Sequence, residues 1–190
     1  GCESELSTAQ QAQLDTILAQ GASEGIAFFQ ASGDTGPDEC LNSNAVGVDF
    51  LSADPHVVAV GGTSYPQGGT ETYWYTNTSI AGGYGTSTVF QAPTYQLPLG
   101  LSMRSVPDVS ADADYATGYA EYCYSGGLCS GWEESGGTSA ATPLWAGLAA
   151  DINTYLNDIG RPTLGTASAL LYQIGYNQSP YAAYHDITSG

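Results

Sequence analysis

The residue with the clearest chemical potential in this chain is Ser139, which stands at the entry to an apolar stretch. Gly136, Gly137 and Thr138 precede it, and the apolar residues 144–150 follow shortly after. A serine at a glycine-rich helix entry keeps its hydroxyl exposed, and the free N–H groups and dipole of the first turn favour developing negative charge. This arrangement suits a nucleophile. The alternative is a serine that only caps an ordinary buried helix.

A second candidate is Asp34, in the turn of residues 32–36, which reads Ser-Gly-Asp-Thr-Gly. The turn directly follows the short apolar run 26–31, which we interpret as a buried strand because Gly25 and the turn bound it on either side. The carboxyl of Asp34 therefore stands at the end of a strand. From the residues alone, an Asx turn is an alternative role for it.

Further motifs along the chain resemble the sedolisin, or serine-carboxyl peptidase, family, whose members are relatives of subtilisin. Besides the segments around Asp34 and Ser139, the matching stretches are residues 52–55 (SADP), 58–63 (VAVGGT), 71–74 (ETYW), 82–84 (GGY), 107–114 (PDVSADAD), 117–119 (TGY) and 185–188 (HDIT). Each motif is weak alone, but their order and spacing together are specific. The resemblance covers nearly the whole chain and implies a subtilisin-like α/β fold and peptidase activity on peptides or proteins.

The resemblance also implies roles for single residues. Ser139 matches the nucleophile that forms an acyl-enzyme, and Gly137 and Thr138 beside it are expected to contact the substrate. Asp34 matches an aspartate of the oxyanion hole, which is protonated at acidic pH and donates to the tetrahedral oxygen; a charged carboxylate there would repel that oxygen. Asp49 matches a carboxylate of the substrate cleft, although by itself it equally fits a solvated loop acid.

A calcium site is implied near the end of the chain. Asp186 and Ile187 match its first part, one carboxylate and one backbone carbonyl. Calcium takes about six to eight oxygen ligands. The remaining ligands of the family site would fall after Gly190, so only part of the Ca²⁺ site is expected in this chain.

The catalytic base of the family has no counterpart here. Sedolisins use a glutamate, oriented by an aspartate four residues later on a helix, and no such helical pair occurs in the sequence. Asp108 and Asp112 have the interval, but they belong to the Pro-Asp-Val-Ser motif, which we interpret as structural. His56 and His185 are interpreted as polar surface or loop residues, so a Ser-His-Asp triad is disfavoured.

Three explanations account for the missing base and calcium ligands. The chain is a fragment or processed piece of a longer peptidase, one chain of a two-chain enzyme, or a non-catalytic secreted binding or structural module on the same fold. We favour the first, in which residues 1–190 are a single domain, the C-terminal portion of a peptidase domain that is incomplete at both ends. The N-terminal part of the enzyme would then be a partner, and the isolated chain would be inactive.

Composition limits the partners and the compartment. Two basic residues stand against 19 acidic ones, giving a formal net charge of -17. Repulsion argues against nucleic acid and against an anionic membrane surface. Because carboxylates lose their charge near about pH 4, such a surface also tolerates acidic surroundings. No apolar run is long enough to span a membrane, and no export signal is recognised at the start of the chain, so we expect a signal that has been removed.

The four cysteines indicate an oxidising compartment, and hence a secreted or extracellular protein, possibly in an acidic compartment. Cys123 and Cys129 can close a short ring inside a Gly-Ser loop, and Cys2 and Cys40 bracket the segment that carries Asp34. Of three possible connectivities we favour Cys2–Cys40 and Cys123–Cys129. No two cysteines have Cys-x-x-Cys spacing with a histidine nearby, so we do not expect zinc.

The element pattern predicts a parallel sheet flanked by helices. A capping box at residues 7–10 begins a helix of roughly four turns that ends near Gly21. Residues 57–60 form a second buried strand, ended by Gly61 and Gly62, and two further helices run over residues 138–156 and 167–173. Strands buried on both faces and separated by helices imply an α/β sheet. Residues 63–105 are expected to be long loops over a cleft.

Overall fold

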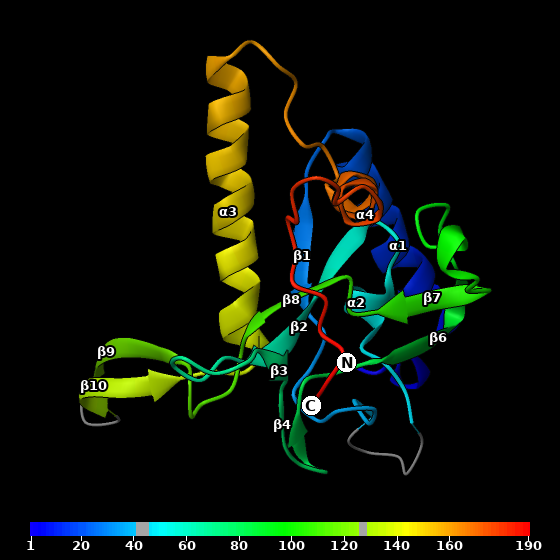
Figure 1. Ribbon diagram of the computed structural model, residues 1–190. Helices are drawn as coiled ribbons and strands as arrows, with labels where there is room; N and C mark the ends of the chain where they lie inside the picture. The colour runs from blue at the N-terminus through cyan, green and yellow to red at the C-terminus, as the bar shows by residue number, and fades with distance from the viewer. Residues whose placement is uncertain (41–45, 126–128) are drawn as a thin grey trace.

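A short, mostly parallel sheet forms the centre of the molecule (Figure 1). The computed structural model describes residues 1–40, 46–125 and 129–190. Strand β2 (Val57–Ser64) pairs in parallel with β1 (Phe28–Ala31) and with β8 (Val109–Asp112), and antiparallel with the short β3 (Thr72–Tyr73). The predicted α/β fold with a parallel sheet is confirmed.

Strand β2 carries core residues on both of its faces. Val58 and Val60 belong to one hydrophobic cluster, together with Trp74. Ala59, between them in sequence, belongs to a second cluster with Val106. Because successive side chains of a strand point to opposite faces of the sheet, β2 is covered on both sides, as expected for a central parallel strand.

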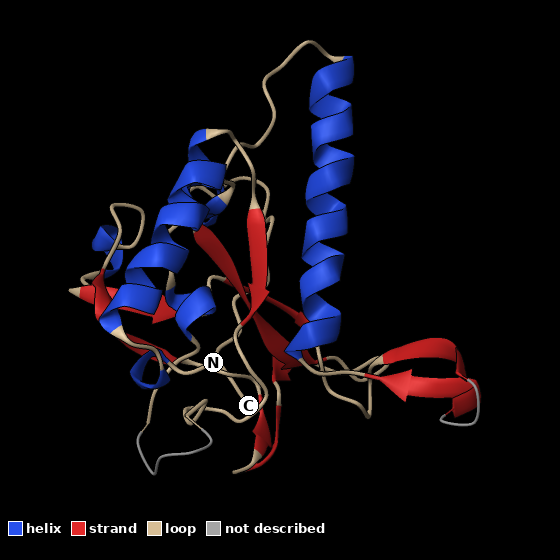
Figure 2. Ribbon diagram, turned by 180° about the vertical axis from the view of Figure 1, so that it is seen from behind, coloured by secondary structure: helices blue, strands red, loops and turns tan. Residues whose placement is uncertain are grey.

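Helices lie on either side of this sheet. Helix α3 (Thr138–Asp158) packs on β1, β2 and β8. Helix α1 (Thr8–Ser23) lies on the other side in both views (Figures 1 and 2). The one-turn helix α2 (Phe50–Ala53) packs against β2, and α4 (Ser168–Tyr176) adds Leu171 to the cluster that contains Val58.

The start of α1 follows the predicted capping box. Ser7 Oγ accepts a hydrogen bond from the backbone N–H of Gln10, and the Gln10 side chain accepts one from the backbone N–H of Ser7. This reciprocal pair satisfies two of the N–H groups that a helix start leaves free. A short 3-10 helix, η1 (Glu3–Glu5), precedes it.

Gly61 and Gly62 do not end the strand, so that prediction was wrong: β2 continues to Ser64. A Cβ on Gly61 would lie 2.6 Å from Cγ of Pro107, and one on Gly62 would lie 2.8 Å from Cβ of Ala113. The two glycines therefore let β2 approach its neighbours closely.

The prediction of long loops over residues 63–105 was also wrong. After β3 this segment forms β4 (Tyr75–Asn77), β5 (Ile80–Ala81), β6 (Gly85–Gln91), the 3-10 helix η2 (Leu97–Leu99) and β7 (Met103–Val106). Strands β4 and β5 pair antiparallel, as do β6 and β7. Strands β4, β5 and β7 have only two to four residues, too few to show a periodicity of their own, so pairing with a partner decides where they form. The longer β6 pairs with β7 in a register that shifts between Thr86 and Gln91.

A buried ion pair between β7 and the start of β8 is hydrogen-bonded to α4. The side chains of Arg104 and Asp108 are fully buried and form two hydrogen bonds of 2.6 Å, one from each terminal nitrogen of the guanidinium. Asp108 also accepts from the backbone N–H of Ala59 at 2.7 Å and from the hydroxyl of Tyr172 at 2.8 Å. Burial alone would lower the pKa of Arg104, but Asp108 more than offsets this and raises it. Asp108 thus has the structural role predicted for its motif.

Both predicted disulfides are present. Cys2 is bonded to Cys40, and Cys123 to Cys129. The second joins β9 (Tyr119–Ser125) to β10 (Cys129–Ser135), a hairpin that projects from the body of the molecule in Figures 1 and 2. None of the described helices combines the length and the apolar character needed to cross a membrane.

Candidate active site

The first turn of α3 presents Ser139 to solvent. Gly137 is the N-cap residue, with a φ of 80° that favours glycine, and Thr138 begins the helix and is fully buried. Ser139, the second residue of the helix, is exposed. Its backbone N–H lies in the first turn, where a helix offers no carbonyl partner. Both the hydroxyl and a polarised N–H are therefore available at one place.

Asp34 is bound to this helix start. Its Oδ1 accepts a hydrogen bond of 2.7 Å from the backbone N–H of Thr138 and lies 2.8 Å from the Thr138 hydroxyl. The other oxygen, Oδ2, lies against Gly137, where a Cβ would be only 2.6 Å away. Asp34 and Thr138, separated by 104 positions in sequence, are thus in direct contact, and the predicted neighbours Asp34, Gly137, Thr138 and Ser139 come together.

The turn that carries Asp34 is held by the segment after β5. The buried hydroxyl of Ser32 donates to the carbonyl of Gly83 at 2.7 Å, and the N–H of Gly83 donates to the carbonyl of Gly33 at 2.7 Å. The N–H of Ala81 donates to the carbonyl of Asp34 at 3.0 Å. These bonds fix the direction in which the carboxyl of Asp34 leaves the end of β1.

A cavity of about 330 Å³ opens beside this segment. Gly82, Gly83 and Tyr84 line one part of it, and Pro107 and Ser110 line another. Because Gly83 is hydrogen-bonded to the turn of Asp34, the cavity adjoins that turn.

Glu39 is a further acidic residue at the site, and sequence reasoning missed it. Its carboxylate accepts from the backbone N–H of Thr35 at 2.9 Å and lies against Gly33, where a Cβ would be 1.9 Å from its carboxyl carbon. Burial raises the pKa of Glu39, and the nearby charges of Asp34 and Asp49 raise it further. Only its position five residues after Asp34 could have indicated it.

Asp49 lies near these acids and caps the short helix α2. Its Oδ1 accepts from the backbone N–H of Ser52 at 3.0 Å, so it is the N-cap of α2. An N-cap carboxylate satisfies a free N–H group and interacts favourably with the helix dipole. The predicted contact of Asp49 with substrate stays a prediction.

The residues predicted for calcium lie elsewhere. Asp186 and Ile187 line a cavity of about 770 Å³ together with Glu71 and His185. The imidazole of His185 lies 2.8 Å from the Glu71 carboxylate. One carboxylate and one carbonyl are far from the six to eight oxygens of a calcium site, and in residues 1–40, 46–125 and 129–190 no cluster of acidic or histidine ligands includes Asp186. By themselves the described residues do not form a calcium site.

No side chain of the described residues is hydrogen-bonded to the hydroxyl of Ser139. Asp108 is enclosed in its ion pair, and Asp112 accepts from the hydroxyl of Thr117 at 2.7 Å. His185 is paired with Glu71, as described above. The described residues therefore place an exposed hydroxyl next to a carboxyl at the start of α3, with no titratable side chain hydrogen-bonded to that hydroxyl.

The chain is similar to known peptidases along most of its length. Kumamolisin from Bacillus sp. (strain MN-32) is 34% identical over 206 residues, which cover 100% of this chain and 34% of kumamolisin. Tripeptidyl-peptidase 1 of Macaca fascicularis is 33% identical over 192 residues, covering 90% of this chain and 32% of that protein. Sedolisin from Pseudomonas sp. (strain 101) is 32% identical over 194 residues, covering 93% and 31%. The chain thus spans about a third of the length of these relatives.

A solved structure shows the same likeness. Pseudomonas sedolisin, a serine-carboxyl proteinase complexed with two molecules of pseudo-iodotyrostatin, superposes with a TM-score of 0.82 at 29% identity. The match covers 100% of this chain and 53% of that one. No protein-family model matches the sequence.

Proposed function

This chain is homologous to the serine-carboxyl peptidases of the sedolisin family, and we propose that it is part of an acid-acting peptidase with Ser139 as nucleophile. The observation that carries the proposal is the contact between Asp34 and Thr138. It brings a carboxyl to the start of the helix on which the exposed serine stands. Peptide or protein substrates follow from the peptidase homologues.

The proposed reaction begins with attack of Ser139 Oγ on the carbonyl carbon of the peptide bond. The hydroxyl proton passes to a base, and the carbonyl oxygen becomes an oxyanion. The amine then leaves with a proton, which gives an acyl-enzyme on Ser139, and water hydrolyses that ester. Each proton is taken up and returned, so the base is regenerated.

Asp34 has the task of stabilising the oxyanion. Its Oδ1 is occupied by the two donors of Thr138, which leaves Oδ2 to carry a proton and donate it. A neutral carboxyl donates to an oxyanion, whereas a carboxylate repels it. The backbone N–H of Ser139 is the second donor in this proposal.

The base in this proposal is a glutamate oriented by an aspartate, supplied by a part of the peptidase outside these 190 residues. We place that part against α3, because four large apolar side chains of α3 and its end are exposed there. They are Leu144, Leu148, Tyr155 and Ile159. A partner segment would bury this apolar face.

Compartment and calcium remain proposals as well. The two disulfides support secretion into an oxidising compartment. Calcium binding by Asp186 and Ile187 needs further oxygen ligands, and no step of the proposed reaction uses it.

The proposal is tested by Ser139→Ala in the complete peptidase. We expect turnover to fall by several orders of magnitude with the fold intact, because a nucleophile is lost. Thr142→Ser, one turn further along α3, is the matched control and should retain activity. Near-normal peptide hydrolysis by Ser139→Ala would contradict the assignment.

A non-catalytic module on the same fold is the second candidate, favoured by the lack of a base among the described residues. Such a module would bind peptides without turnover even as the complete protein. Acid-pH cleavage by the complete protein, lost in Ser139→Ala, decides for the peptidase.

A further inference from the structure

A group of three ligand-type side chains lies apart from Ser139 and Asp34. Asp15 in α1, Asp54 at the end of α2 and His56 before β2 each offer one ligand atom, and these atoms lie within 4.8 Å of one another. They come from two segments that are separated by about 40 residues in sequence. The peptidase proposal uses none of the three.

Asp54 has a carboxylate oxygen without a partner. The residue is fully buried. Its Oδ1 accepts from the backbone N–H of His56 at 2.8 Å, but its Oδ2 has no hydrogen-bond donor among the described residues. The side chain facing it is the carboxyl of Asp15, which in its charged form only accepts. A buried carboxylate oxygen without a donor is costly, so this one calls for a positive ligand.

The carboxyl groups of Asp15 and Asp54 lie close together. A bound cation would compensate the charge of both carboxylates at once.

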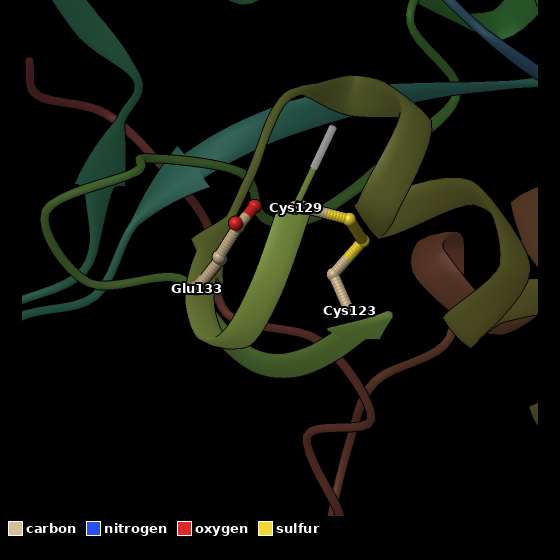
Figure 3. A group of neighbouring side chains, drawn as sticks. All are labelled: Cys123, Cys129 and Glu133. Atoms are coloured by element: carbon tan, nitrogen blue, oxygen red, sulfur yellow. A yellow bond between two sulfur atoms is a disulfide. The ribbon is translucent and has the colours of Figure 1, made fainter. Parts of the chain in front are cut away.

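A second group of side chains of metal-binding type does not offer three metal ligands. Figure 3 shows Cys123, Cys129 and Glu133, with the two sulfurs joined to each other. Sulfur in a disulfide is not a thiolate, and thiolate is the form that binds metal. Only one ordinary ligand, the exposed Glu133, remains in that group.

We infer that Asp15, Asp54 and His56 bind a divalent transition metal, with zinc as the best fit. Two carboxylates and one imidazole are ligands that zinc accepts, and a water molecule can complete a tetrahedron. Calcium prefers six to eight oxygens, so it fits a set with a nitrogen ligand poorly. The metal would join α1 to the segment between α2 and β2 and thereby fasten the helix to the sheet.

Zinc titration of the full chain at neutral pH tests the inference. Isothermal titration calorimetry with zinc chloride should show one site, and the melting temperature should rise by roughly 5 °C or more at saturating zinc. Calcium chloride at the same concentrations should give neither effect. The readout is metal binding, so failure of the peptidase proposal would not affect it.

Variants assign the ligands. His56→Gln and Asp54→Asn should each weaken zinc binding at least tenfold, because a direct ligand is lost. The chain has two histidines, so His185→Gln is the matched control and should bind zinc like the unmodified chain. His56 is partly exposed, which makes His56→Gln the decisive variant if Asp54→Asn does not fold.

Nitrogen chemical shifts of the two imidazole rings give an independent answer. Zinc should shift the ring of His56 and leave that of His185 unchanged. The inference is overturned if zinc does not bind, if it acts on His185 and Glu71 instead, or if His56→Gln binds it as tightly as the unmodified chain.

Discussion

At the scale of single residues, the proposed chemistry depends on where the two carboxyl oxygens of Asp34 lie. Oδ1 accepts hydrogen bonds from the buried Thr138, while Oδ2 lies beside Gly137. The absence of a side chain on Gly137 makes this approach possible, because any Cβ there would overlap Oδ2. The same small residue that lets the chain turn into α3 therefore also admits the carboxyl.

Two substitutions of Asp34 in the complete peptidase separate its proposed donation to the oxyanion from its acceptance of hydrogen bonds from Thr138. Asp34→Ala should lower kcat by roughly 10²–10³, the usual effect of losing an oxyanion donor. Asp34→Asn keeps an acceptor for Thr138 and a neutral donor, so it should retain more activity.

Steady-state kinetics of both variants measure this, with Asp151→Asn on the exposed side of α3 as control. An equal loss of kcat in Asp34→Asn and Asp34→Ala would show that a neutral donor at this position does not assist the reaction.

Glu39→Gln tests the acidic surroundings of the site through stability. The pKa of Glu39 is raised from its ordinary value of 4.5, mainly by burial. Such a group contributes stability that is present below the unfolded pKa and is lost as pH rises through the folded pKa. Glutamine stays neutral, so the variant should match the unmodified protein in acid and exceed it in stability toward neutral pH.

Urea unfolding at a series of pH values measures the effect. Glu24→Gln is the control, because Glu24 is an exposed glutamate directly after α1. Parallel stability curves for Glu39→Gln and the unmodified protein would refute the prediction.

At the scale of elements, the buried pair of Arg104 and Asp108 organises the contacts of β7, β8 and α4. Removing one partner leaves a buried charge without compensation, which costs about 3–5 kcal/mol. Asp108→Ala should therefore strongly lower the free energy of unfolding, and denaturant titration would show it.

Replacing both partners by apolar residues should be much less harmful, since no charge then remains buried. Arg104→Met combined with Asp108→Leu is expected to recover part of the lost stability. Equal or greater destabilisation in the double variant would mean that the bonds from Asp108 to Ala59 and Tyr172 carry most of the effect.

At the scale of the whole molecule, our proposal assigns the nucleophile and the oxyanion carboxyl to these 190 residues and the base to another part of the peptidase. A serine hydroxyl without a base loses roughly 10²–10⁴ in rate from missing proton transfer alone. The isolated 190-residue chain should therefore show no appreciable peptide cleavage in acid, while the complete peptidase should be active. Robust cleavage by the isolated chain would show that one of its own residues serves as the base.

Much of the local structure could be predicted because it depends on neighbouring residues. The capping box at Ser7 starts α1, the small residues before Ser139 start α3, and the buried runs around Phe29 and Val58 form parallel strands. The favoured disulfide pairing was confirmed as well, since few connectivities are possible with four cysteines. The homology to sedolisins rests on motif order, which the sequence carries directly.

Other features were decided only by the tertiary structure. The continuation of β2 through Gly61 depends on the close approach of Pro107, and the elevated pKa of Glu39 depends on burial beside Asp34. Spacing in sequence does not reveal which distant segments will pack, because long-range contacts are chosen by the burial of apolar surface and the pairing of buried polar groups. For that reason the family resemblance, and not the spacing of residues, predicted that Asp34 and Ser139 share a site, while only the fold brought Asp15 to Asp54.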